Sequence, residues 1–478
     1  MRNDIGISTI VDARAAELCA LSDRVWETPE LNYQEYRSSA EHAEMLERQE
    51  FRVSRQVAGL PTALMGEAGE GGPIVAILGE FDALPGLSQQ AGVAEPRPLV
   101  ASGNGHGCGH NLLGAASLLA ATAVKDFLAA HGMPGRVRYY GCPAEEGGSA
   151  KGFMVRAGVF DDVDVAISWN PSAFTGVNRA FSLACVEMEF HFSGRSAHAA
   201  ASPHLGRSAL DAVELMNVGV NYLREHIPST ARIHYALIDG GGIAPNVVQA
   251  KAVVRHLIRA QNITELLALV ERVKKVAQGA ALMTETEVRW SQLSGDANLV
   301  GNAALEQAMQ ENLLGLGAPP FDDHDRAFAE EIRATLRKED IVAAYGRFGL
   351  EPRLDEPLSK EVYPLGSGVD SLVGSTDVGT VSWVVPTVQC RVATYAVGTP
   401  GHSWQLVAQG RAPAAHKGMV HAAKAMAATA CDVLTDAGLL ARARSEHAAF
   451  RAEQAFTNPI PDDVEPPLDM SRAAEAAR

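Results

Sequence analysis

Residues 102–121, SGNGHGCGHNLLGAASLLAA, join a glycine-rich stretch with two histidines and a cysteine to a run that is almost wholly apolar. The length and composition of that run predict a helix over Leu112–Ala130. Short apolar runs nearby predict buried strands at Ile74–Leu78, Arg136–Tyr140 and Val163–Ser168. Strands that alternate with helices are typical of an α/β fold, here with a mixed, mainly parallel sheet.

Each predicted strand is followed closely by a polar cluster. The clusters are Glu80-Phe81-Asp82, Pro143-Ala144-Glu145-Glu146 and Trp169-Asn170-Pro171. Open α/β sheets bind their ligands at the carboxyl ends of the strands. The three clusters are therefore expected to converge on one site.

The pattern of predicted elements changes near Ala184, where a strand, a helix, two strands and a helix follow one another. This pattern predicts a smaller α+β domain at residues 184–294 that interrupts the first domain, residues 1–183 and 295–478. A surface insertion is expected near 317–370. Near the amino end, Thr28-Pro29-Glu30 has the pattern of a capped helix start, with proline at the first helical position.

Composition narrows the classes of function. The chain has 478 residues and a formal net charge of −16, without a run of lysine or arginine, so nucleic acid and anionic membranes would be repelled. The longest apolar stretches are too short and too alanine-rich for a membrane span, and the first ten residues lack the features of a signal peptide. Six scattered cysteines do not form a disulfide framework. We expect a cytoplasmic protein with a small-molecule substrate.

The glycine-rich stretch has three possible interpretations: a nucleotide loop, a tight turn before a helix, or a metal site. A G-x-G-x-x-G pattern fails, because Cys108 or His110 falls where the third glycine must be. Cys108-Gly109-His110 offers a thiolate and an imidazole at short spacing, which suits a metal ion. The pair Glu145-Glu146 adds two carboxylates, one able to ligate and one able to move protons.

Asp82 and His402 extend this set to enough ligands for a two-metal hydrolytic centre, although each alone could be an ordinary turn or surface residue. Two other kinds of catalysis can be compared with this one. No G-x-S-x-G elbow is present for a serine hydrolase. A Cys108 nucleophile beside His106 or His110 stays open, and chelation would separate it from a metal enzyme.

Several motifs together resemble one family, the co-catalytic metallohydrolases that include aminoacylases, carboxypeptidase G-type enzymes and hippurate hydrolases. They are ETPELNYQE, GEFDALP, GHGCGHN, PAEEGGSAKGFMV, FSGRSAHAAASPHLGRSALDA, GGGIAPNVV, GSTDVGTVSW and GTPGHSWQ, and they cover nearly the whole chain. The resemblance implies that Cys108 bridges two divalent ions, manganese or zinc. It also implies that His110, Glu146 and His402 are further ligands and that Glu145 is the general base.

One expected ligand is missing. The resemblance implies a histidine or an acidic residue where this chain has Asn170, whose neutral amide is a weak ligand. The second ion is therefore expected to be loosely held, absent or held in another way.

The implied reaction is hydrolysis of the amide bond of an N-acyl or N-aroyl amino acid, such as p-aminobenzoyl-glutamate, with Asp82 in the catalytic group. The smaller domain is implied to be a lid that forms a homodimer, or an assembly with a related second subunit. His198 would then reach into a partner's site, while Asn246 and Arg259 would bind the substrate's carboxylate. Two alternatives stay open: a weakly active or non-catalytic subunit of a hetero-oligomer, and a binding protein for acylated amino acids.

Overall fold

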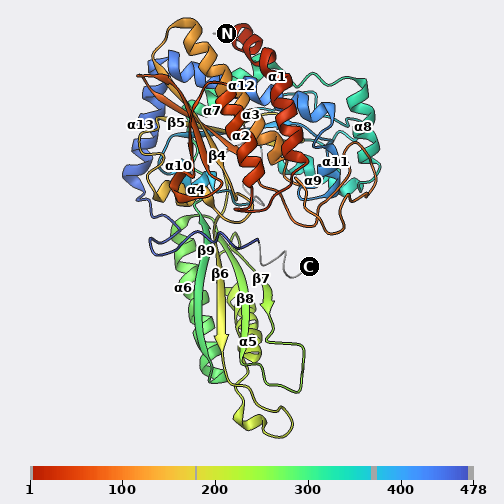
Figure 1. Cartoon of the computed structure of the whole chain (residues 1–478), viewed down its shortest axis with the longest axis vertical. Coiled ribbons are helices and arrows are strands. Elements are labelled where there is room, and N and C mark those ends of the chain that lie inside the picture. The colour runs from red at the N-terminus through yellow and green to blue at the C-terminus, as the bar shows by residue number, and fades with distance from the viewer. Residues whose placement is uncertain (1–3, 178–179, 368–373, 472–478) are drawn as a thin grey trace.

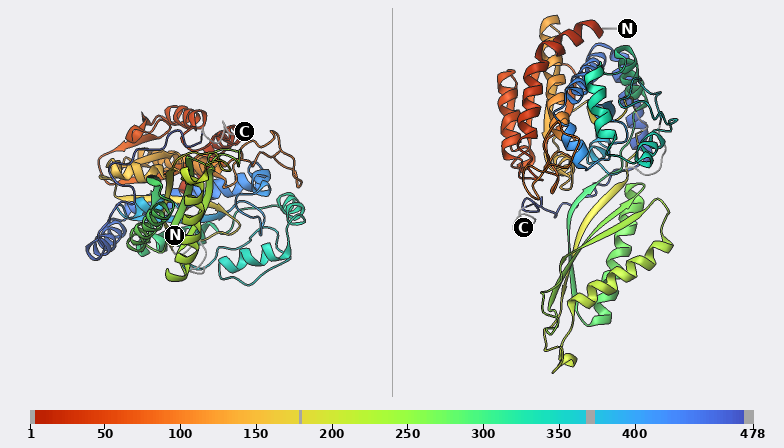
Figure 2. Two further views of the ribbon diagram at one scale, coloured as in Figure 1. Left: turned by 90° about the horizontal axis from the view of Figure 1, so that it is seen from below. Right: turned by 90° about the vertical axis from the view of Figure 1, so that its right-hand side faces the viewer.

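The computed structural model describes residues 4–177, 180–367 and 374–471. A large α/β domain carries a narrow, elongated second domain below it (Figure 1). The second domain is formed by one continuous stretch in the middle of the sequence, and the chain returns to the first domain afterwards (Figure 2). We refer to the two parts by the names that the family resemblance implies, the catalytic domain and the lid.

The catalytic domain is built on a six-stranded sheet in the order β1-β2-β4-β3-β5-β10. Strands β4, β3, β5 and β10 run parallel, while β1 and β2 add an antiparallel edge, so the sheet is mixed and mainly parallel as predicted. The strands are β1 (Arg52–Arg55), β2 (Leu64–Glu70), β3 (Ile74–Glu80), β4 (Gly135–Cys142), β5 (Val165–Ser172) and β10 (Thr387–Ala393).

Helices cover the faces of this sheet. The central one, α3, runs from His110 to His131 and packs against α1, α12 and β3. Its composition would also suit a membrane span, but 83% of its apolar window is buried within the domain, so its apolar residues form core. The helices of the domain are α1 (Asp4–Trp26), α2 (Tyr36–Arg48), α3, α4 (Ala150–Arg156), α7 (Ala303–Leu316), α8 (Asp323–Arg333), α9 (Lys338–Arg347), α10 (Val378–Ser382), α11 (Trp404–Gln409), α12 (Pro413–Thr435) and α13 (Ala437–Glu453).

The lid is an antiparallel sheet in the order β7-β8-β6-β9, and two helices pack on one face of it. It spans Ala184–Asp296, two residues beyond the expected end, because a last strand follows the second helix. The sequence pattern did not predict that strand. The elements are β6 (Ala184–Ser193), α5 (Ala209–Leu223), β7 (Arg232–Asp239), β8 (Lys251–Ala260), α6 (Ile263–Thr284) and β9 (Glu287–Asp296).

The predicted helix start at Thr28-Pro29-Glu30 is wrong, because these residues form the connection between α1 and α2. The Glu30 carboxylate instead accepts hydrogen bonds from the backbone N–H groups of Arg37 and Ser38, in the first turn of α2. An acidic group beside a helix amino end is stabilised in this way, so Glu30 stabilises the start of the following helix, α2. The expected insertion near 317–370 carries α8 and α9, at the right of the large domain in Figure 1, and its residues 368–370 lie outside the described part of the chain.

Candidate functional site

The polar clusters meet at the carboxyl ends of the parallel strands. β3 ends at Glu80 and leads to Asp82, β4 ends just before Glu145 and Glu146, and β5 contains Asn170. The α3 helix begins at the same edge with His110, directly after Gly109 in a left-handed conformation (φ 79°). Glycine allows this tight entry, which turns Cys108 and His110 toward one point. The expected convergence on one edge of the sheet is thus present.

His110 is the hub of the cluster. Its side chain is 1% exposed, and its Nδ1 lies 2.8 Å from Oδ1 of Asp82, so the ring donates its proton there. The other ring nitrogen, Nε2, is buried and has no hydrogen-bond partner among the described residues. It faces carboxylate oxygens of Glu80 at 3.4 Å and of Glu145 and Glu146 at 3.9 Å each. A ring nitrogen that faces several carboxylates needs a positive charge there. A metal ion can supply it, and so can a proton on the ring, since Cys108 and Asp82 outweigh burial and raise the pKa of His110.

The donor set fits a divalent cation. Ligand atoms of Cys108, His110 and Glu146 all lie within 4.8 Å of one another, and a second group of the same kind joins Glu80, His110 and Glu145. Thiolate, imidazole and carboxylate are the ligands that zinc prefers, and carboxylates also suit manganese. The buried Glu146 Oε1, like His110 Nε2, lacks a hydrogen-bond partner in the described part of the chain. The cluster therefore has the composition and the unsatisfied atoms of a metal centre.

Cys108 does not have the environment of a cysteine nucleophile. Burial, with the neighbouring Glu146 carboxylate, raises the pKa of its thiol to about 12. Nucleophilic cysteines need a lowered pKa, whereas a bound cation would itself favour the thiolate. The structure thus supports a ligand role for Cys108 rather than the open alternative of a cysteine hydrolase.

Asp82 positions other residues of the centre. It is fully buried; Oδ1 accepts from His110 and Oδ2 accepts from the backbone N–H of Glu146 at 2.9 Å. Burial alone would raise the pKa of Asp82, but His110, the Glu146 backbone N–H and Lys151 together outweigh it and lower that pKa. An ionised carboxylate on Nδ1 fixes the tautomer in which Nε2 is the free ligand atom.

Glu145 and Glu146 follow Ala144, whose left-handed backbone (φ 52°) turns the loop back toward α3. The backbone N–H of Ala144 donates to the buried carboxylate of Glu35, which holds this turn. Burial raises the pKa of both Glu145 and Glu146, and the Glu80 carboxylate raises that of Glu145 further. A raised pKa suits a carboxylate that accepts and later returns a proton.

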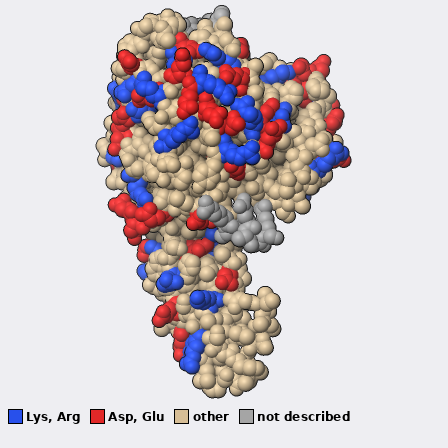
Figure 3. Space-filling model, in the orientation of Figure 1, with Lys and Arg blue, Asp and Glu red and all other residues tan. Residues whose placement is uncertain are grey.

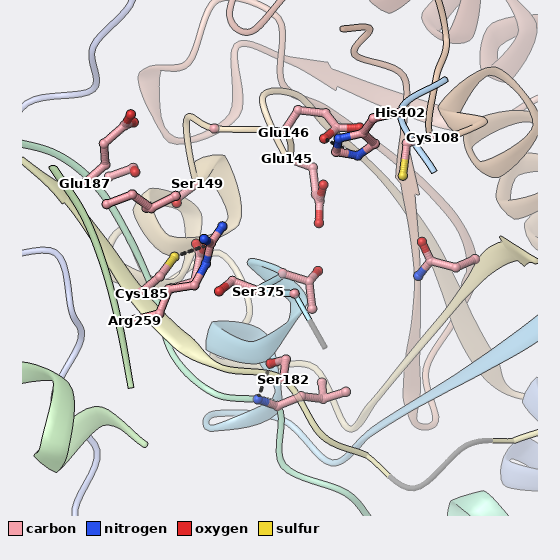
Figure 4. Close-up of a pocket in the computed structure, with 18 of the residues that line it drawn as sticks. Cys108, Glu145, Glu146, Ser149, Ser182, Cys185, Glu187, Arg259, Ser375 and His402 are labelled. Atoms are coloured by element: carbon pink, nitrogen blue, oxygen red, sulfur yellow. Dashed lines mark hydrogen bonds and ion pairs between the residues drawn. The ribbon is translucent and has the colours of Figure 1, made fainter. Parts of the chain in front are cut away.

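His402 approaches from the loop after β10. Its backbone N–H donates to Gly107 in the glycine-rich stretch, and its Nε2 lies 3.4 Å from Oε2 of Glu146. The side chain is 57% exposed, in contrast to the buried His110. Figure 4 shows His402, Glu146 and Cys108 together at one end of a pocket, with Glu145 nearer its middle.

This pocket has a volume of about 370 Å³ and joins the catalytic domain to the lid. Asn170 and Arg391, which lie level on the neighbouring strands β5 and β10, line its catalytic side. Arg259 lies at the lid end, beside Cys185 (Figure 4). Cys185 and Asp296 stand level with it across β8, β6 and β9. The sequence predicted Arg259 here, but missed the buried Asp296 because its strand was missed.

His198 and Asn246 are not brought to this pocket within one chain. Both are exposed, and their loops meet at the end of the lid that is remote from the catalytic domain, where Ala199 N–H donates to the Asn246 carbonyl. Since β6 has ten residues, the two ends of the lid sheet are roughly 30 Å apart. Within one chain, therefore, neither residue reaches the pocket.

Comparison with known proteins gives the family. The profile of peptidase family M20/M25/M40 matches residues 76–356. The chain is 47% identical over 471 residues to one of the subunits of the p-aminobenzoyl-glutamate hydrolase of Escherichia coli, covering 96% of this chain and 98% of that protein. It is 30% identical to mouse Xaa-Arg dipeptidase, over 94% and 93% of the two chains. A solved dinuclear metal-binding peptidase of Bacillus subtilis shares the fold, with a TM-score of 0.58, 18% identity and coverage of 89% and 99%.

These relatives are hydrolases, and they favour an enzyme over the two alternatives of a non-catalytic subunit and a binding protein. The buried donor cluster and the matches agree with the family resemblance of the motifs. The chain belongs to peptidase family M20/M25/M40, and it is a metal-dependent amidohydrolase.

Proposed function

We propose that this amidohydrolase cleaves N-acyl or N-aroyl amino acids and that p-aminobenzoyl-glutamate is a substrate. The observation that carries the proposal is one pocket that holds the Cys108–His110–Glu146 cluster, Glu145 and, at its far end, Arg259. Such a pocket offers a hydrolytic centre and a carboxylate-binding cation to the same small molecule. The 47% identity to a p-aminobenzoyl-glutamate hydrolase chain supports this choice of substrate.

Two divalent ions, manganese or zinc, are proposed as the cofactors. Cys108, His110, Glu146 and His402 would hold them, with Asn170 near the position that the family fills with a stronger ligand. When bound, such ions polarise an amide carbonyl and acidify water.

Glu145 is proposed as the general base. It stands between the metal end and the lid end of the pocket (Figure 4), where the amide bond of a substrate would lie. Its carboxylate would take a proton from the attacking water and deliver it to the amide nitrogen as the leaving amine departs. Asp82 would assist by holding His110 and the Glu146 backbone in place.

Arg259 is proposed to bind the α-carboxylate of the amino acid. Its planar guanidinium can pair with a carboxylate through two hydrogen bonds. Its buried Nε has no hydrogen-bond partner among the described residues, so this N–H can donate to a bound carboxylate. Asn246 is proposed to contribute a further contact from the lid loop of a second chain.

A homodimer through the lid is proposed, or an equivalent pairing with a related subunit. Strand β7 is an edge strand with neighbours on one side only, and it exposes Tyr235, Leu237 and Ile238. The adjacent helix α5 exposes Tyr222 and Val218 as well. Figure 3 shows few charged side chains over this lower right part of the lid, in contrast to the catalytic domain. Exposed apolar edges of this kind are typical of surfaces that pair with another chain.

A second candidate substrate is a dipeptide with a basic carboxy-terminal residue. Glu187 and Asp296 both line the lid end of the pocket, where they could accept from a guanidinium or ammonium group. The Xaa-Arg dipeptidases among the relatives are named for such substrates.

The cytoplasm is proposed as the location of the protein, in line with the expectation from the sequence.

The test uses the purified full chain loaded with manganese or zinc. We expect release of p-aminobenzoate and glutamate from p-aminobenzoyl-glutamate, loss of that release on chelation, and recovery when the metal is restored. Glu145→Gln is the matched inactive control. Cleavage of Xaa-Arg dipeptides alone would favour the second candidate, and turnover that survives complete metal removal would contradict the mechanism.

A further inference from the structure

Glu80 occupies a place in the metal centre for which neither the sequence motifs nor the family ligand set gives a role. It is the last residue of β3, whose seven residues are all buried, and its side chain is 3% exposed. Strand periodicity puts Glu80 and Asp82 toward the same side, with Phe81 buried in the core between them. Both carboxylates consequently reach His110, one at each ring nitrogen.

The orientation of Glu80 is fixed by Lys151. The ammonium of Lys151 is fully buried and lies 2.6 Å from Oε1 of Glu80 and 2.6 Å from Oδ1 of Asp377. Asp377 also accepts from the backbone N–H of Lys151 through its other oxygen, so the lysine is held at both ends. This arrangement uses one Glu80 oxygen for the lysine, and the other oxygen, Oε2, faces His110 Nε2.

The charges around Glu80 are unbalanced without a cation. Five carboxyl groups with side chains at most 14% exposed lie here: Glu80, Asp82, Glu145, Glu146 and Asp377. Lys151 pairs with Glu80 and Asp377, and His110 is the basic group beside the others. Buried like charges repel strongly, and a lysine shared by two carboxylates neutralises only one. A divalent ion next to Glu80 would remove this excess.

The interatomic spacing fits shared ligation. Two ligand atoms at 2.0–2.2 Å from a tetrahedral ion lie about 3.4 Å apart. Glu80 Oε2 and His110 Nε2 are separated by 3.4 Å, and so are Glu146 Oε2 and His402 Nε2. These two pairs use different atoms and different residues. Cys108 lies near both, since it groups with His110 and Glu146.

Glu80 also stands beside the residue that is the weakest of the proposed ligands. The parallel register of β3 and β5 pairs Ile77 with Ile167. Glu80 and Asn170 each follow this last pair by three residues, so both lie toward the carboxyl ends of neighbouring strands.

We propose that Glu80 is a metal ligand, which shares with His110 the ion that Asn170 alone would hold poorly. This inference rests on the proposed two-metal function and deepens it. Lys151 is then a positioning residue: it holds Oε1 of Glu80 and leaves Oε2 toward His110.

The test measures metal content per chain, by elemental analysis after loading with zinc or manganese and exhaustive dialysis. Wild type should retain two ions and Glu80→Gln one, because the dissociation constant of the second ion should rise by more than about 100-fold, beyond the effect of losing an outer partner. Asp377→Asn is the matched control: it removes the other carboxylate of Lys151 without touching His110, and it should retain two ions.

Three outcomes would overturn the assignment. Retention of two ions by Glu80→Gln would show that Glu80 is no ligand, while leaving the proposed function intact. Equal loss in Asp377→Asn would show an effect transmitted through Lys151. Wild type that binds no ion would contradict the proposed function itself.

A measurement on wild type protects the test against a variant that fails to fold. Anomalous diffraction from zinc- or manganese-loaded crystals should show an ion within about 2.2 Å of a Glu80 carboxylate oxygen. Ions that leave Glu80 in contact with Lys151 alone would refute the proposal.

Discussion

The metal end of the pocket and the remote loops of the lid differ in how completely one chain builds them. At the metal end, His110 is 1% exposed and Asp82 uses both oxygens to hold its neighbours. At the remote end of the lid, His198 and Asn246 are exposed and have mainly local contacts, such as the Ala200 and Ala201 N–H groups that donate to His198. The side chains of the metal end are held in position by contacts within one chain, which fixes their geometry for catalysis. The lid loops lack such contacts, so a lid residue can be supplied by a second chain.

The largest effect should come from Glu145→Gln, at the metal end. Loss of the general base should lower kcat by about 10²–10⁴-fold. Since Glu145 is proposed to move protons rather than ligate, metal content per chain should stay as in wild type. Steady-state kinetics with elemental analysis checks both points. Loss of a metal ion together with activity would instead make Glu145 a ligand.

Asp82→Asn should have the next largest effect. The asparagine amide has one oxygen that accepts and one nitrogen that donates. Its oxygen can accept from His110, but it has no second oxygen to accept from the Glu146 N–H, as Oδ2 of Asp82 does. Metal affinity should fall about 10–100-fold, as expected for a partner that orients ligands. Competition titration with a chelating dye measures it. An unchanged affinity would mean that the metal end does not depend on this support.

The sequence was a good guide to the metal end where the signal was local. Cys108 and His110 are two residues apart and Glu145-Glu146 are adjacent, so their grouping could be predicted before any fold was known, and the structure brings them together. The role of Glu80 could not be, because it depends on Lys151, which Asp377 holds from 226 residues further along the chain. Buried ion pairs between distant segments leave no periodic pattern in a sequence.

The lid was harder to predict for a different reason. Strand β9 has weakly alternating burial, mostly exposed at its start and buried at its end, so its pattern did not mark it as a strand. Missing it also hid Asp296. For His198 and Asn246 the motif is visible, but their placement depends on contacts outside the single chain, which no local pattern can supply.

A smaller effect is expected at the lid end of the pocket, from Arg259→Lys. Replacing a two-pronged donor with a single ammonium should raise KM roughly tenfold and leave kcat within about twofold, because the lost contact binds the substrate rather than the reacting atoms. Arg232→Lys is the matched control, since Arg232 lies level with Arg259 on the neighbouring strand β7, is exposed and does not line the pocket. A fall in kcat alone would contradict the assignment of Arg259 to substrate binding.

Mixed subunits test most directly whether the lid of one chain completes the metal end of another. His198→Ala and Glu145→Gln chains, each nearly inactive alone, are exchanged at equal amounts, and exchange is verified by mass spectrometry. Half of the dimers should then be mixed, each with one intact site, so about one quarter of wild-type activity should return. No activity above that of the separate variants, with exchange verified, would contradict the account.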